Sequence, residues 1–176
     1  MRRAQAGDAE AFGGLVARHR QSALRVATVV LGGGSDADDV VQTASERAWR
    51  ALASVEPERG FRAWFLRIVT NTARNQRRAW WRRRRAELRV AARPLGDITD
   101  PIDDTVTASE RDVVVAALNR LAAQERLVIA LRHFEQLTEQ EMAAVLDCAP
   151  GTVKSRLSRA MSRLRSELAM EASGDA

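Results

Sequence analysis

Apolar residues recur every three or four positions along most of this chain, and no stretch alternates apolar with polar residues as a half-buried strand does. This spacing predicts an all-α fold. A length of 176 residues with 45% apolar content allows either one ordinary core or two small helical ones. The number of domains therefore has to be inferred from the order of the elements along the chain.

The first half of the chain is predicted to form three helices. They span about Asp8–Leu31, then Ser35 or Asp36 to Leu52, and Phe61 to Arg85. Gly32-Gly33-Gly34 ends the first helix, and a loop at Val55–Gly60 precedes the third. The second carries one apolar stripe, made by Val40, Val41, Ala44, Ala48, Trp49 and Leu52. The third begins apolar and ends in a run of arginines, so its far end is too charged to be core.

Periodicity is lost between residues 91 and 109, where prolines and aspartates gather. This composition predicts a flexible acidic linker between two domains. The second half is predicted to hold helices at about 110–122, 124–134, 139–146 and 151–170. The expected organisation is two small helical domains on a tether, with a first domain at 1–90, the linker at 91–109, a second domain at 110–170 and a disordered tail at 171–176.

The second domain contains a pattern typical of a helix-turn-helix. Thr138-Glu139-Gln140-Glu141 predicts a capping box, Asp147 to Gly151 a turn, and Pro150 or Gly151 the start of the next helix. Around that helix, one face is apolar (Val153, Leu157, Ala160, Leu164 and Leu168) and the opposite face is polar (Ser155, Ser158, Arg159 and Ser162). Small hydroxyl side chains flanked by cations allow close approach to DNA, although a solvated amphipathic helix would show the same stripe.

Charge and composition narrow the class of function. Arginines crowd residues 74–89 and 154–165 of a chain whose net charge is +5, and Lys154 is the only lysine. Local basic blocks indicate a polyanionic partner. The apolar stretch Ala23 to Leu31 is too short to cross a bilayer, so a soluble, cytoplasmic protein is expected. No clustered site for catalysis, a metal or a cofactor is evident, and we expect none.

These motifs together resemble a known family. Leu121 to Leu168 is similar to the fourth conserved region of the extracytoplasmic-function sigma factors, most clearly at Gly151 to Ala160. Upstream, Gly7 to Phe12, Asp36 to Trp49 and Phe61 to Asn71 resemble the second conserved region of that family in order and spacing. The resemblance implies a sigma factor without enzymatic activity, which binds core RNA polymerase and promoter DNA.

The resemblance also implies roles for individual residues in promoter recognition. Contacts to the bases of the −35 element in the major groove are expected from Lys154, Ser155, Ser158 and Arg159, and contacts to its backbone from Thr152, Arg156 and Arg163. The melted −10 strand is expected to meet Trp64, Arg67, Asn71, Arg74, Arg77 and Arg78, at a pocket between the Val55–Gly60 loop and the third helix. Trp64 lies among apolar residues and is more often core than stacking platform in such a setting, whereas Trp80 and Trp81 are better candidates for exposed stacking.

Partners follow from the same resemblance. The polar face of the second helix, formed by Asp39, Gln42, Glu46 and Arg47, is expected to dock on the clamp of the largest polymerase subunit, and the second domain on the flap region. An anti-sigma factor is an expected partner, and the chain is expected to be a monomer without one. The alternative is a dimeric helix-turn-helix regulator that is not a sigma factor.

Overall fold

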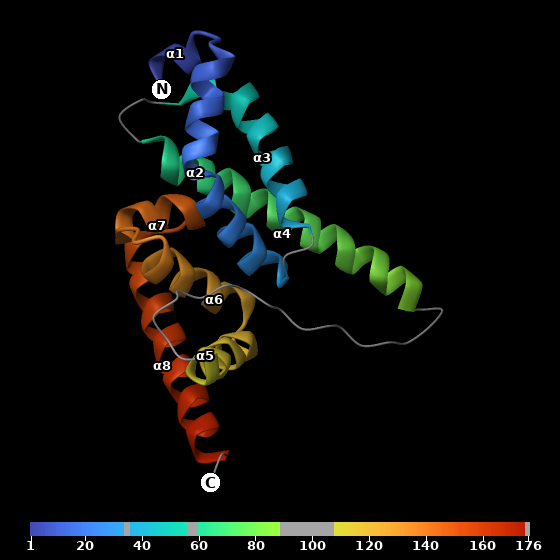
Figure 1. Cartoon of the computed structure of the whole chain (residues 1–176), viewed down its shortest axis with the longest axis vertical. Helices are drawn as coiled ribbons and strands as arrows, with labels where there is room; N and C mark the ends of the chain where they lie inside the picture. The colour runs from blue at the N-terminus through green and yellow to red at the C-terminus, as the bar shows by residue number, and fades with distance from the viewer. Residues whose placement is uncertain (34–35, 56–59, 89–107, 175–176) are drawn as a thin grey trace.

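The chain is described by a computed structural model that covers residues 1–33, 36–55, 60–88 and 108–174 (Figure 1). The elements are α1 (Arg2–Gln5), α2 (Ala9–Leu31), α3 (Ala37–Ala51), η1 (Leu52–Ser54), α4 (Phe61–Leu88), α5 (Ala108–Arg120), α6 (Ala123–Ile129), η3 (Ala130–Phe134), α7 (Glu139–Leu146) and α8 (Pro150–Gly174). No strand occurs in these ranges, so the predicted all-α fold is confirmed.

Local chemistry fixes the ends of α2 where the sequence predicts them. The Asp8 carboxylate accepts a hydrogen bond from the Ala11 amide at 2.9 Å, which satisfies one of the free donors of the first turn. At the other end Gly32 has a φ of 84°, a left-handed conformation that glycine adopts without steric cost. The short helix α1 precedes this cap and is not predicted by the sequence.

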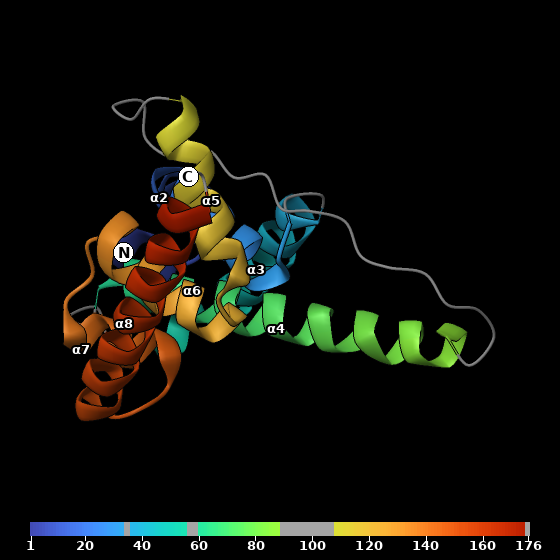
Figure 2. The ribbon, with the colours of Figure 1, turned by 90° about the horizontal axis from the view of Figure 1, so that it is seen from below.

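The first domain packs α2, α3 and α4 around one core (Figure 1). Its fully buried side chains include Val26, Val40, Phe65 and Val69. Trp49 departs from the predicted apolar stripe of α3, because 38% of it is exposed, although its ring centroid lies 5.0 Å from that of Phe12. The C-terminal part of α4 projects away from the other helices (Figures 1 and 2), as its arginine run predicts.

The second domain consists of α5 to α8. Its core is formed by buried apolar side chains that include Leu127, Leu131, Met142, Val145 and Val153. The helix predicted at 124–134 is interrupted, since α6 passes at Ala130 into a π-helical turn, η3. The last helix is longer than expected: α8 reaches Gly174, so the tail predicted to be disordered from residue 171 is helical as far as 174.

The two domains lie against each other. Helix α4 contacts α7, and α2 contacts both α6 and η3. The prediction of two domains on a flexible tether did not include packing between them. Most of the predicted linker lies outside the described residues. We call this packing the closed arrangement, and the set of contacts between the two domains the interdomain contact.

Candidate nucleic-acid interface

Helices α7 and α8 form the predicted helix-turn-helix. Thr138 Oγ1 accepts from the Glu141 amide at 3.2 Å, and the Glu141 carboxylate accepts from the Thr138 amide at 2.8 Å, which completes the capping box. Asp147 follows α7 with a φ of 55°, the left-handed conformation that a glycine often adopts at a turn. The next helix starts at Pro150, as predicted.

The face of α8 that was predicted to read bases is open to solvent. Lys154, Ser155, Ser158 and Arg159 are all exposed. On the opposite face Val153 and Ala160 are fully buried, and Leu157 is half-buried. The apolar stripe therefore anchors the helix and fixes which side chains point outward.

The residues expected on the DNA backbone have only light contacts within the described chain. Thr152 and Arg156 are half-buried, and Arg163 is exposed. The Arg156 guanidinium donates to the thiol of Cys148 at 3.8 Å, and Arg163 lies 4.0 Å from Glu125. Neither contact uses more than a fraction of the five N–H donors of an arginine.

The residues predicted to meet the melted −10 strand all lie on helix α4. Arg67, Asn71 and Arg78 are exposed, and Arg74 and Arg77 are half-buried. Arg67 donates to the Asp147 carboxylate at 2.8 Å, and Arg77 to the Val30 carbonyl at 3.0 Å. Most of the loop that the sequence places beside this set, residues 56–59, lies outside the described residues.

The tryptophans of α4 divide as the sequence suggests. Trp64 is half-buried in an aromatic cluster, with its ring centroid 5.6 Å from that of Phe61. Trp80 and Trp81 are 36% and 43% exposed and pack edge to face, with centroids 5.0 Å apart. Trp64 therefore contributes to the core, whereas Trp80 and Trp81 lie at the surface.

The predicted docking face on α3 is exposed along its length. Asp39, Gln42, Glu46 and Arg47 are all exposed. Gln42 donates to Glu46 at 3.4 Å, and Arg47 donates to the Thr72 hydroxyl at 3.2 Å, which links this face to α4. These contacts are light enough to leave the face available to a partner.

The interdomain contact includes a buried carboxylate that the sequence analysis did not single out. Glu135 follows η3 in the second domain and is 1% exposed. Its carboxylate accepts from Arg25 Nε at 2.7 Å and from Arg62 Nη2 at 2.8 Å, both in the first domain. Burial raises the pKa of the Glu135 carboxyl, but hydrogen bonds from Arg25, Ser22 and Arg62 outweigh it and hold the pKa below its ordinary value.

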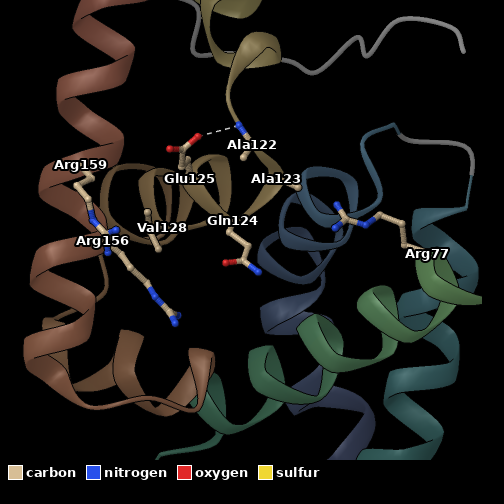
Figure 3. A pocket seen from close by; sticks show the side chains of 8 residues that line it. All are labelled: Arg77, Ala122, Ala123, Gln124, Glu125, Val128, Arg156 and Arg159. Carbon is tan, nitrogen blue, oxygen red and sulfur yellow. Dashed lines mark hydrogen bonds between the residues drawn. The ribbon is translucent and has the colours of Figure 1, made fainter. Parts of the chain in front are cut away.

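A cavity between α4 and α8 is lined by residues of both predicted DNA-binding sets. It has a volume of about 220 Å³ and is bounded by Arg74, Arg77 and Arg78 of α4, by Arg156 of α8 and by Val30, Ala123, Gln124, Leu127 and Leu146. We call it the arginine cavity. A second cavity of about 580 Å³ shares Arg77, Ala123, Gln124 and Arg156 with it and is also lined by Glu125 and Arg159. Figure 3 shows Arg156 and Arg159 on one side, Arg77 on the other and Gln124 between them.

Two further properties of the described residues bear on function. They contain no group of three or more histidine, cysteine or carboxylate side chains arranged to hold a metal ion. None of the helices within them combines the length and the apolar content needed to cross a bilayer.

Comparison with known proteins identifies both halves of the chain. Residues 15–85 match the family described as Sigma-70 region 2, and residues 111–164 match Sigma-70, region 4. The RNA polymerase sigma-E factor of Streptomyces coelicolor is 39% identical over 153 residues, which are 86% of this chain and 82% of the relative. The ECF RNA polymerase sigma-E factor of Escherichia coli strain K12 is 34% identical over 166 residues, 90% of this chain and 86% of the relative.

Solved structures give the same answer. The sigma factor RpoE of Bartonella quintana, in complex with the anti-sigma factor NepR, superposes with a TM-score of 0.75 at 26% identity and covers 90% of this chain and 97% of its own. CnrH, in complex with the cytosolic domain of CnrY, gives 0.65 at 32% identity and covers 99% and 95%. With two helical domains that match region 2 and region 4 in order, the chain belongs to the extracytoplasmic-function sigma factors, which carry out no chemistry themselves and direct the initiation of transcription by RNA polymerase.

Proposed function

We propose that this sigma factor reads the −35 element as duplex DNA with α8 and holds the −10 element as a melted non-template strand with α4. The observation that carries the −35 part is the exposure of Lys154, Ser155, Ser158 and Arg159 on one face of α8. A buried stripe fixes the opposite face, so these side chains enter the major groove together. Thr152, Arg156 and Arg163 flank them and hold the phosphates.

The −10 part is supported by the open face of α4. A flipped base costs a few kcal/mol to unstack, and a basic track with a hydrogen-bonding side chain can recover this cost. Arg67, Arg74, Arg77 and Arg78 supply the track, and the exposed amide of Asn71 supplies donors and an acceptor for a base edge. Trp64 borders this region as a packed side chain.

The closed arrangement must open for both elements to be bound at once. The −35 and −10 elements are separated by about 25 base pairs, or about 85 Å of duplex at 3.4 Å per pair. Helix α8, with 25 residues, is only about 38 Å long. Arg77 and Arg156 line one cavity here, so the two DNA-binding sets are far too close to span a promoter.

Polymerase docking is assigned to the α3 face, with Asp39, Gln42, Glu46 and Arg47 on the clamp of the largest subunit and the second domain on the flap. This places the protein in the cytoplasm, where RNA polymerase works. By analogy with RpoE and CnrH, an anti-sigma factor is the proposed regulator of a monomeric free chain. The family assignment gives no support to a dimeric regulator.

Substitution of Arg159 tests the assignment of −35 readout. Arg159→Ala is expected to lower promoter occupancy through the loss of a contact to one −35 base, by a factor that corresponds to about 1–3 kcal/mol. The measurement is transcription with core enzyme on a promoter library randomised at −35. Arg18→Ala, which removes the same charge from an exposed site on α2, is the control. An equal loss on all sequences would make Arg159 a phosphate contact instead.

A further inference from the structure

The four arginines of the arginine cavity come from both domains. Arg74, Arg77 and Arg78 belong to α4, and Arg156 belongs to α8. Within the described residues none of them forms an ion pair with an acidic side chain. Arg77 donates to one carbonyl and Arg156 to one thiol, so most of their N–H donors remain available for a ligand.

Closing the two domains brings these charges together at an energetic cost. Burial lowers the pKa of the Arg74 guanidinium, and repulsion from Arg156, Arg78 and Arg77 lowers it further. The largest of these repulsions comes from Arg156, which lies on the other domain. An anion placed among the four side chains offsets that repulsion, and it can do so only while the domains are closed.

We propose that the arginine cavity binds a short chain of linked phosphates, which bridges the two domains and favours the closed arrangement. Arginine guanidinium groups pair bidentately with phosphate oxygens, and a linked chain can reach arginines on both walls.

The phosphate chain can come from inorganic polyphosphate or from a nucleoside triphosphate. Gln124 lies between the two walls and offers an amide to either (Figure 3). If the proposed function holds, the ligand also competes with promoter DNA. Three of the four arginines belong to the set proposed for the −10 strand, and Arg156 belongs to the set proposed for the −35 backbone. Binding to the free chain does not depend on that function.

The test uses the full chain without polymerase or DNA, at fixed ionic strength. Isothermal titration with sodium tripolyphosphate is expected to give saturable binding at one site. Arg156→Gln, in one domain, and Arg74→Gln, in the other, should each lower the affinity at least about tenfold. Arg83→Gln removes an exposed charge from α4 outside the cavity and should change it by less than about twofold. Equal losses in all three variants, or no saturable binding, would overturn the proposal.

A second measurement tests the bridging. Small-angle scattering of the Glu135→Gln variant, which lacks the acidic partner of the interdomain contact, should show a radius of gyration that falls when tripolyphosphate is added. Addition of Arg156→Gln to that variant should abolish the fall. Titration with adenosine triphosphate distinguishes the two sources: tighter binding than tripolyphosphate indicates a nucleotide, and weaker binding indicates the inorganic chain. Binding without any compaction would contradict a bridge between the domains.

Discussion

Substitution of Glu135 by glutamine is expected to open the closed arrangement. Removing one partner from a fully buried ion pair costs about 3–5 kcal/mol. Here the Arg25 and Arg62 side chains keep 34% and 35% exposure, so water recovers part of that loss. The glutamine amide also still accepts one hydrogen bond. We therefore expect a loss of about 2 kcal/mol, which shifts the ratio of closed to open molecules about 30-fold.

Small-angle scattering measures this shift as an increase in the radius of gyration, at a helical content that circular dichroism finds unchanged. Glu139→Gln, which removes the same charge from an exposed site on α7, is the matched control. Arg25→Gln removes one of the two ion pairs and should give a smaller expansion, and the double variant should expand little further than Glu135→Gln alone, because Glu135→Gln already removes the pair with Arg25. A radius of gyration equal to that of the unaltered chain in both single variants would refute the role of this pair in closure.

Three further outcomes are expected. The pKa of the Glu135 carboxyl lies below its ordinary value of 4.5, so the contact is at full strength above that pH and is lost as the pH falls through the lowered pKa; scattering should show acid expansion that Glu135→Gln lacks. Thr138→Ala should destabilise the second domain by about 1 kcal/mol in thermal melts, whereas Thr138→Ser should not. Asp147→Ala should lower the melting temperature more than Asp147→Gly, because the left-handed φ of 55° strains alanine.

The sequence predicts well those features that depend on residues only a few positions apart. The capping box joins Thr138 to Glu141, and the turn needs only a residue that tolerates a left-handed backbone at Asp147. Helical spacing likewise separates the buried and exposed faces of α8. Such local rules identify the helix-turn-helix and the exposure of the α8 face that is predicted to read bases.

The interdomain contact could not be predicted in the same way. Glu135 lies 110 residues from Arg25 and 73 residues from Arg62, and no periodic pattern connects positions at such separations. Arg67 and Asp147 likewise meet across 80 residues. Two domains can satisfy every helical pattern in the sequence whether or not they pack against each other. Only the structure reveals that residues of both predicted DNA-binding sets line one cavity.

The projecting part of α4 has a consequence for folding cooperativity. Its N-terminal turns are held by the core of the first domain, which supplies the nucleus that an isolated helix lacks. Beyond that core, Arg74, Arg78 and Arg82 follow one another at four-residue intervals, and like charges at this spacing oppose helix propagation. We therefore expect the helicity of this arm to rise with ionic strength and to fall with temperature. A polyanion that neutralises these arginines should lengthen the helical arm. Helix formation in the arm and binding of a polyanion to its surface are therefore thermodynamically linked.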